Sequence, residues 1–277
     1  MAKLITDNET LMAYVPNAIA AVRGETALFD KIAVHLQAAE QWLCRHFIDA
    51  ELLQTSIDSE PLADTLRRIV VAEALRQAVP SLDLVYTPNG FAVVQTSNLT
   101  PASKQRVDRL IGTLLTLRDN AIEDALNILP AVAGWSDTPQ GQFFARSLFA
   151  NIDLPRLVGS QANDHWSAFL ELQPRAAEVE ESLAEDYFSP ELLAHLRAGA
   201  ITPEGLPKEH NFVATAIKAQ TVAVLQDKSI NARRMADVVN FIRQRPDDFP
   251  QWHGSSTAQL FSPPIFKNSK KSGGYFF

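Results

Sequence analysis

A repeating stripe of apolar residues constrains the fold of this chain more than any other feature. From Thr26 onward, apolar side chains recur at intervals of three and four residues, a period that places them on one face of an α-helix of about seven turns. The stripe consists of Leu28, Ile32, Leu36, Ala39, Leu43, Phe47 and Ala50. Such a helix must cover its apolar face, so the chain is predicted to fold by packing helices together.

Further stretches with the helical period follow, and proline and glycine mark their ends. Pro80 ends the second stretch, Thr100 and Pro101 are a typical N-cap and first-turn pair, and Gly199 ends a short helix that Ser189 caps. Besides the first helix, we expect helices at about 61–79, 100–129, 140–149, 162–188, 190–199, 207–226 and 231–245.

One stretch, residues 82–96, has strand character instead. It contains two short runs that are rich in β-branched and aromatic residues, and Thr87-Pro88-Asn89-Gly90 between them is typical of a turn. We therefore expect one β-hairpin here. An isolated hairpin is marginally stable in water, so it must pack on helices or pair with another chain.

Proline and glycine concentrate between residues 130 and 160, which favours a boundary there. The predicted fold class is mainly α, with two helical-bundle modules and an extended C-terminal tail. The modules are an N-terminal one with the hairpin at 1–130 and a C-terminal one at 161–260, joined by a linker region at 131–160 and followed by a flexible aromatic and basic tail at 261–277.

The two halves also resemble each other weakly. When the sequence is aligned with itself at an offset of 140 residues, Phe47 aligns with Tyr187 and Glu40 aligns with Glu180. In both halves a long helix ends in an aromatic–aliphatic step, and another apolar stripe follows. Because helical stripes match one another easily by chance, the sequence leaves open whether the chain is a true duplication.

Charge and hydropathy argue against several classes of protein. The net charge is −7, and the excess of acidic residues lies before Lys228, whereas the end of the chain is basic. An acidic body repels phosphates, which argues against direct nucleic-acid binding. No stretch approaches the roughly 18–20 apolar residues of a membrane span, and the start of the chain does not resemble a signal peptide. We expect no membrane association and a cytoplasm-like compartment.

The sequence shows no pattern typical of a catalytic, cofactor or metal site, so we expect a protein that is not an enzyme. Cys44 is interpreted as a half-buried core residue rather than a reactive thiol, and scattered histidines provide no zinc-binding spacing. His46 and Asp49 are an acid–base pair or, by the preferred interpretation, a helix-flank contact.

Three larger groups, one of acidic residues, one of arginines and one of tryptophans, also have a functional and a structural interpretation. The structural interpretation is preferred for the acidic residues and the tryptophans. The acidic group is a carboxylate site or a solvated stripe, the arginines are an anion site or charges at helix ends, and the tryptophans are a stacking platform or anchors between helices. The groups are Glu178, Glu181, Glu185 and Asp186; Arg233, Arg234, Arg243 and Arg245; and Trp42, Trp135, Trp166 and Trp252.

Several segments together resemble an uncharacterised family from prophage-like regions of gut bacteria. They are Leu4-Ile5-Thr6 to Tyr14-Val15-Pro16, Gly24 to Asp30, Thr87 to Val94 running into Leu99 to Ser103, and Gly273-Gly274-Tyr275-Phe276-Phe277. The arrangement of a long helix, a break and an alanine-rich second helix is also similar to the helical head–tail connector adaptors of tailed phages. In that group, copies form a ring beneath the portal and bridge it to the tail.

The resemblance implies a structural virion protein, a connector in the neck that waits in the host cytoplasm before assembly. Its partners would be portal, tail or neck proteins and further copies of itself in a ring, with no cofactor or metal. The alternative is a helical scaffolding or regulatory module that binds proteins outside the virion. The residues expected to bind a partner lie in the tail, for which plain disorder is the other interpretation: Phe266, Lys270, Lys271, Tyr275, Phe276 and Phe277.

Overall fold

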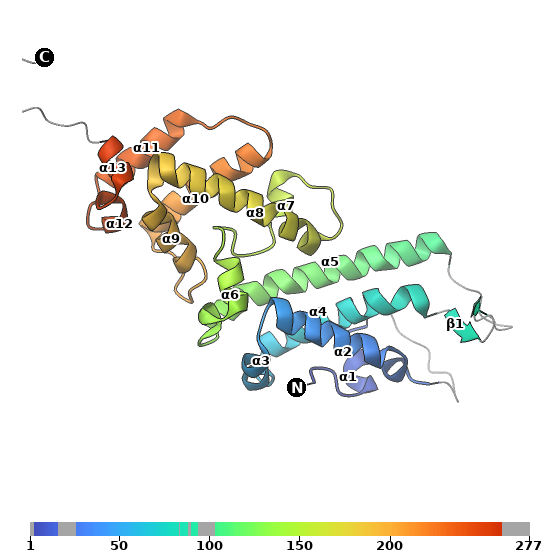
Figure 1. The fold of residues 1–277 in the computed structure, drawn as a ribbon. Helices are drawn as coiled ribbons and strands as arrows, with labels where there is room; N and C mark the ends of the chain where they lie inside the picture. The colour runs from blue at the N-terminus through green and yellow to red at the C-terminus, as the bar shows by residue number, and fades with distance from the viewer. Residues whose placement is uncertain (1–2, 16–25, 83, 88–89, 94–102, 262–277) are drawn as a thin grey trace, which may run out of the picture.

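The computed structural model describes residues 3–15, 26–82, 84–87, 90–93 and 103–261. This part of the chain is mainly helical, which confirms the predicted class (Figure 1). The first half contains α1 (Asn8–Met12), α2 (Leu28–His46), α3 (Ala50–Ser56), α4 (Leu62–Ala78), the 3-10 turn η1 (Val79–Ser81), α5 (Lys104–Ile128), the 3-10 turns η2 (Leu129–Ala131) and η3 (Trp135–Asp137), and α6 (Pro139–Phe144). The second half contains α7 (Leu154–Val158), α8 (His165–Leu183), the π-helical turn η4 (Ala184–Phe188), α9 (Pro190–Gly199), α10 (Lys208–Leu225), α11 (Ala232–Arg243), α12 (Pro250–His253) and α13 (Ser256–Leu260).

The stretch with strand character contains two strands of four residues each, β1 (Leu84–Thr87) and β2 (Gly90–Val93). They pair antiparallel, with Leu84 opposite Val93 and Thr87 opposite Gly90. Paired backbone therefore covers less of the chain than residues 82–96, the stretch that the sequence pattern marks. Residues 83, 88–89 and 94–96 lie outside the described part of the chain.

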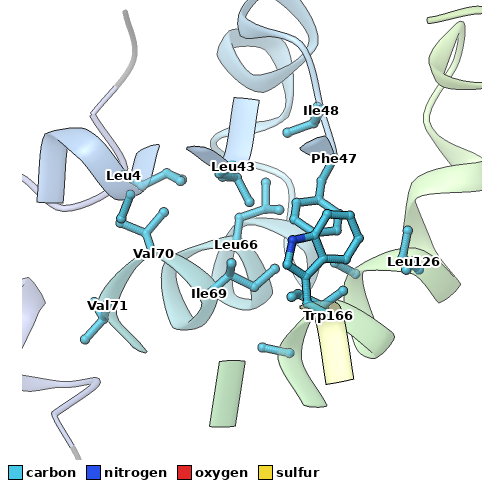
Figure 2. Packing of buried hydrophobic residues seen from close by; sticks show 14 of the residues in the cluster. Leu4, Leu43, Phe47, Ile48, Leu66, Ile69, Val70, Val71, Leu126 and Trp166 are labelled. Atoms are coloured by element: carbon cyan, nitrogen blue, oxygen red, sulfur yellow. The ribbon is translucent and has the colours of Figure 1, made fainter. Parts of the chain in front are cut away.

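The core of the first half forms where α2, α4 and α5 pack against one another. The apolar stripe of α2 is buried, as the period predicts, and α4 is buried on nearly all sides because α2 and α5 cover opposite faces of it. Figure 2 shows Leu43, Leu66 and Ile69 in this core. Trp166, which belongs to α8 in the second half, lies in the same cluster against Phe47.

Residues 131–160, expected to be a linker, are instead packed into the protein. Trp135, Phe144, Phe149 and Ile152 are completely buried. The proline and glycine residues of this stretch end and cap short helices within the core, so their presence does not mark an exposed connection.

The two halves correspond to each other element by element, with the division near residue 146. A short first helix, a long helix, a short helix, two further helices, a turn with a tryptophan and a short last helix follow one another in both halves. We call residues 3–145 the first module and residues 147–261 the second module. The paired elements are α1 and α7, α2 and α8, α3 and α9, α4 and α10, α5 and α11, η3 and α12, and α6 and α13.

Hydrogen bonds at equivalent positions support this correspondence. The indole Nε1 of Trp135 donates to the carbonyl oxygen of Phe47 at 2.7 Å, and that of Trp252 donates to the carbonyl oxygen of Tyr187 at 2.8 Å. Thr138 and Ser255, three residues after each tryptophan, each donate to the tryptophan carbonyl at 2.6 Å. Their side-chain oxygens also cap α6 and α13, respectively.

The modules differ most in their third long helix, which is α5 in the first module and α11 in the second. In the first module, α5 has 25 residues and packs closely along α4, whereas in the second module α11 has 12 residues and touches α10 only briefly. The stretch that contains β1 and β2 lies between α4 and α5 and has no counterpart between α10 and α11. The correspondence is therefore tight around α2 and α8 and looser elsewhere.

Candidate functional site

The six residues expected to bind a partner, Phe266, Lys270, Lys271, Tyr275, Phe276 and Phe277, lie outside the described residues. The expectation about the tail therefore stays a prediction. Within the described residues, the densest collection of chemically distinctive side chains lies at the interface between the two modules.

Aromatic side chains form the centre of this inter-module interface. Trp166 of α8 contacts the rings of Phe47, at 4.7 Å between ring centroids, and of His46, at 5.3 Å. Phe169, one turn later on α8, stacks on Phe144 of α6 at 6.1 Å. The amide of Gln173 completes the contact by donating to the carbonyl oxygen of Phe143 at 2.9 Å. Packing of this kind contributes both apolar burial and favourable ring geometry.

A buried ionic network lies beside the aromatic side chains. The guanidinium group of Arg118 on α5 contacts carboxylates from three elements: Glu73 of α4 at 3.1 Å, Asp119 at 2.7 Å, and Asp164 at the start of α8 at 2.7 Å. Arg118, Glu73 and Asp119 are each only 2% exposed. The guanidinium also lies over the ring of Trp42, 5.7 Å from its centroid. The network thus connects α4 and α5 to the start of α8, the first long helix of the second module.

The titration of these acids reflects burial and pairing. Burial opposes ionisation of Glu73, but hydrogen bonds from Arg76 and Gln77 outweigh it and lower the pKa of Glu73. Burial raises the pKa of Asp119 even though Arg118 lies beside it. The second oxygen of Asp119 accepts the backbone N–H of His165 at 2.8 Å, so this carboxylate also holds the first turn of α8.

A buried glutamate occupies the same place in each module. Glu40 of α2 accepts the backbone N–H of Leu4 at 2.8 Å. Glu180 of α8, 140 residues later, accepts the backbone N–H of Leu148 at 3.0 Å and pairs with Arg197 at 2.9 Å. Burial raises the pKa of Glu40, and it raises the pKa of Glu180 to about 7. We call these two groups the glutamate anchors, because each holds the first segment of its module to its long helix.

The structure separates His46 and Asp49, which the sequence offered as a pair. The Asp49 carboxylate accepts the backbone N–H groups of Glu51 and Leu52 and caps α3. The His46 ring packs between Trp42 and Trp166, where burial lowers its pKa. These two side chains therefore have separate structural roles.

The other sequence-predicted groups lie mostly at the surface. Glu178, Glu181, Glu185 and Asp186 are exposed, which agrees with the preferred interpretation of a solvated stripe, and Arg233, Arg234 and Arg243 are exposed as well. Arg245 packs its guanidinium over the ring of Phe241 and donates to the Phe241 carbonyl. Cys44 is half-buried, as expected, and burial raises its thiol pKa. All four tryptophans take part in packing between elements.

The buried charged residues of the core were not predicted from the sequence, although signals for them were present. Arg118 and Asp119 interrupt the apolar stripe of α5 between Leu114 and Ile122, and a charged pair on such a face indicates a buried partner. The match of Glu40 with Glu180 was visible in the sequence, but neither residue had an assigned role. Glu180 also lies inside the acidic group at 178–186 and is its buried member, at 0% exposure.

A groove of about 700 Å³ opens between the end of α1, α4 and α5. Its lining combines small and aliphatic side chains with two carboxylates, an amide, the ring of Tyr14 and the guanidinium of Arg68. The lining residues include Ala72, Leu75, Leu114, Leu117, Asp64, Asn120 and Asp124. Its volume lies in the range of ligand-binding clefts.

Two absences apply to the described part of the chain. No group of three or more His, Cys, Asp or Glu side chains there is placed to hold a metal ion. No helix in this part of the chain is long and apolar enough to cross a membrane.

Comparison with known protein families gives a match. The model of a family of unknown function, DUF6712, matches residues 19–145 and 198–262. The first matched segment ends where the first module ends. Neither the curated proteins nor the solved structures contain a match.

Proposed function

The chain belongs to DUF6712, a family of unknown function, and we propose that it is a structural virion protein. Its proposed role is that of a head–tail connector in the neck, which assembles as a ring and bridges the portal to the tail. Before assembly it would reside in the host cytoplasm. The proposal treats the protein as a subunit of an assembly and not as an enzyme.

The observation that carries this proposal is the construction of the chain from two equivalent helical modules that pack through different faces. The C-terminal ends of α2 and α6 in the first module contact the N-terminal half of α8 in the second module. A contact between unlike faces is heterologous, and repetition of such contacts builds rings and filaments. A ring subunit made of helices with lateral contacts of this type suits a neck component.

The roles of the buried charged groups also support a structural protein. Arg118, Asp119 and Asp164 connect the modules, and the glutamate anchors hold chain segments in place. Glu180, whose pKa of about 7 would suit acid–base chemistry, is fully buried and bonded to Leu148 and Arg197. Its observed partners are backbone and guanidinium groups of the same chain, which is the arrangement of a structural carboxylate.

The groove between α1, α4 and α5 favours a second candidate function. A helical scaffolding or regulatory module outside the virion would use such a groove to bind a segment of one partner protein. This alternative differs from the connector in stoichiometry, because it forms a small complex of defined composition and not a ring.

Mass spectrometry of purified particles from the host of this chain tests the proposal. We expect peptides of this protein at a copy number comparable to that of other neck components, and a ring in electron micrographs of portal–neck assemblies. Its absence from particles that retain their tails would contradict the connector role. A complex of one copy with one cellular partner would favour the scaffolding or regulatory module.

A further inference from the structure

The interface between the two modules uses one face from each, and both faces have an equivalent elsewhere on the chain. We define the aromatic face by Phe47, Phe143 and Phe144 of the first module, with Trp42 and His46 beside them. We define the helix-start face by Trp166, Phe169 and Gln173 of α8. A shift of 140 residues along the long helices gives Thr26, Phe29 and Ala33 as the helix-start face of the first module.

The aromatic face of the second module follows from the same correspondence. Tyr187 is equivalent to Phe47, and Leu260 and Phe261 are equivalent to Phe143 and Phe144 when the two tryptophans are aligned. The ring contacts agree: Phe47 lies 6.1 Å from Phe144 between centroids, and Tyr187 lies 6.4 Å from Phe261. Phe144 also contacts Trp135 at 6.3 Å, as Phe261 contacts Trp252 at 6.1 Å.

Burial differs between the modules at these positions. Trp166, Phe169 and Gln173 are buried by the aromatic face of the first module, whereas Thr26 and Ala33 are exposed and Phe29 is half-buried. Val34, next to Ala33, is 77% exposed. The other face shows the same difference, because Phe47 and Phe144 are 0% exposed, whereas Tyr187 and Phe261 are half-buried and Leu260 is 72% exposed.

Leu260, one of the most exposed large apolar side chains among those described, therefore belongs to the aromatic face of the second module. One copy presents an aromatic face at its second module and a helix-start face at its first module. We propose that a second copy of this chain docks head to tail on these faces, and that the contact between copies repeats the contact between the modules. This proposal rests on the proposed function, because it specifies how subunits of the ring meet.

The contact between copies is expected to be weaker than the contact between the modules, because its side chains are smaller. Thr26 stands where Trp166 stands in the second module, so the contact between copies buries less aromatic surface. Phe29 corresponds to Phe169. In the proposed contact it faces Phe261 of the second copy, which corresponds to Phe144. We therefore expect reversible association of the isolated protein at high concentration and tighter association when a portal holds the copies together.

Sedimentation of full-length variants tests whether the contact is heterologous. Ala33→Glu blocks the helix-start face and Leu260→Glu blocks the aromatic face, and both positions are exposed, so folding should be unchanged by circular dichroism. Each variant alone is expected to stay monomeric at concentrations where the wild type associates. A mixture of the two should form dimers of one copy each, because one intact pair of faces remains. Ile230→Glu, at a position 38% exposed between α10 and α11, is the control and should associate like the wild type.

Crosslinking captures the contact even when it is weak. Chains with Cys44→Ala carry Ala33→Cys, Leu260→Cys or both, and a short bis-maleimide joins nearby thiols. The equivalent pair between modules, Gln173 and Phe143, is joined by a hydrogen bond of 2.9 Å, so the two cysteines should lie within reach. The double variant should give a ladder of products, and the single variants should give dimers only when mixed.

Three results would overturn the proposal. They are the absence of crosslinked product in every combination, crosslinking of each single variant with itself, and product that appears only after removal of residues 262–277. The last result would show that this segment occupies the aromatic face instead of a second copy. These outcomes are independent of the proposed function, because presence in virions is measured separately: a head-to-tail contact in a protein that is absent from virions would overturn the connector role alone.

Discussion

At the scale of single residues, the glutamate anchors make a pH dependence predictable. Burial raises the pKa of Glu180 from its ordinary value of 4.5 to about 7. The folded state therefore binds more protons than the unfolded state between these values, so this group reduces the free energy of unfolding as pH rises from about 4.5 to 7. Since one pKa unit corresponds to about 1.4 kcal/mol, the reduction is on the order of 3 kcal/mol.

Glu180→Gln removes this titration and keeps an oxygen that can accept the Leu148 N–H. We expect the stability of the wild type relative to this variant to fall as pH rises from 5 to 7, measured by urea unfolding at several pH values. Glu40→Gln should show a change of the same sign, because burial raises that pKa as well. Glu178→Gln, at an exposed position on the same helix, is the matched control. A difference between wild type and Glu180→Gln that is independent of pH would contradict the expectation.

The equivalent tryptophans allow a second test at the residue scale. Trp135→Phe and Trp252→Phe each remove one buried hydrogen bond and leave a backbone carbonyl without that donor. We expect each to lower the free energy of unfolding by about 2–3 kcal/mol. The two losses should be similar and nearly additive in the double variant, because the two indoles lie in separate core clusters. Very unequal losses would show that the two bonds are not equivalent.

At the scale of elements, Arg118 connects α4, α5 and the start of α8. Arg118→Met leaves three carboxylates without a shared cation and should cost about 3–5 kcal/mol in urea unfolding. The loss should shrink as pH falls, because the unpaired acids can then take up protons. Glu123→Gln breaks the partly exposed pair with Arg156 and serves as the control, with an expected cost below about 1 kcal/mol. A loss for Arg118→Met as small as that of the control would contradict a role in joining the modules.

At the scale of the whole molecule, the tail is expected to act in assembly and not in folding. The structure places Phe261 against Trp252 and Tyr187, so a truncation should retain it and begin at residue 262. We expect the truncated chain to keep its melting temperature and its self-crosslinking through Ala33→Cys and Leu260→Cys, but to bind weakly to portal–neck assemblies in a pull-down. A large fall in melting temperature would show that the tail contributes to the fold.

The local pattern of the sequence was enough to predict most helices and the mainly α class. Stripes such as Ile32, Leu36 and Leu43 specify a helix and its buried face through spacing alone, and capping residues such as Ser189 mark its ends. The same local pattern cannot distinguish a linker from short helices that are packed into a core, because proline and glycine suit both. For that reason residues 131–160 were predicted as a linker region, although they pack into the core.

Only the tertiary structure decided that the halves are equivalent and how they meet. From the sequence alone, the match of Glu40 with Glu180 could not be distinguished from a chance match between helical stripes. The hydrogen bonds from Trp135 and Trp252 to equivalent carbonyls show that it reflects a structural correspondence. Besides its neighbour Asp119, Arg118 pairs with Glu73 and Asp164, which are 45 and 46 residues away along the chain. Spacing along a helix determines which side chains share a face, but which distant face covers them depends on how the helices pack.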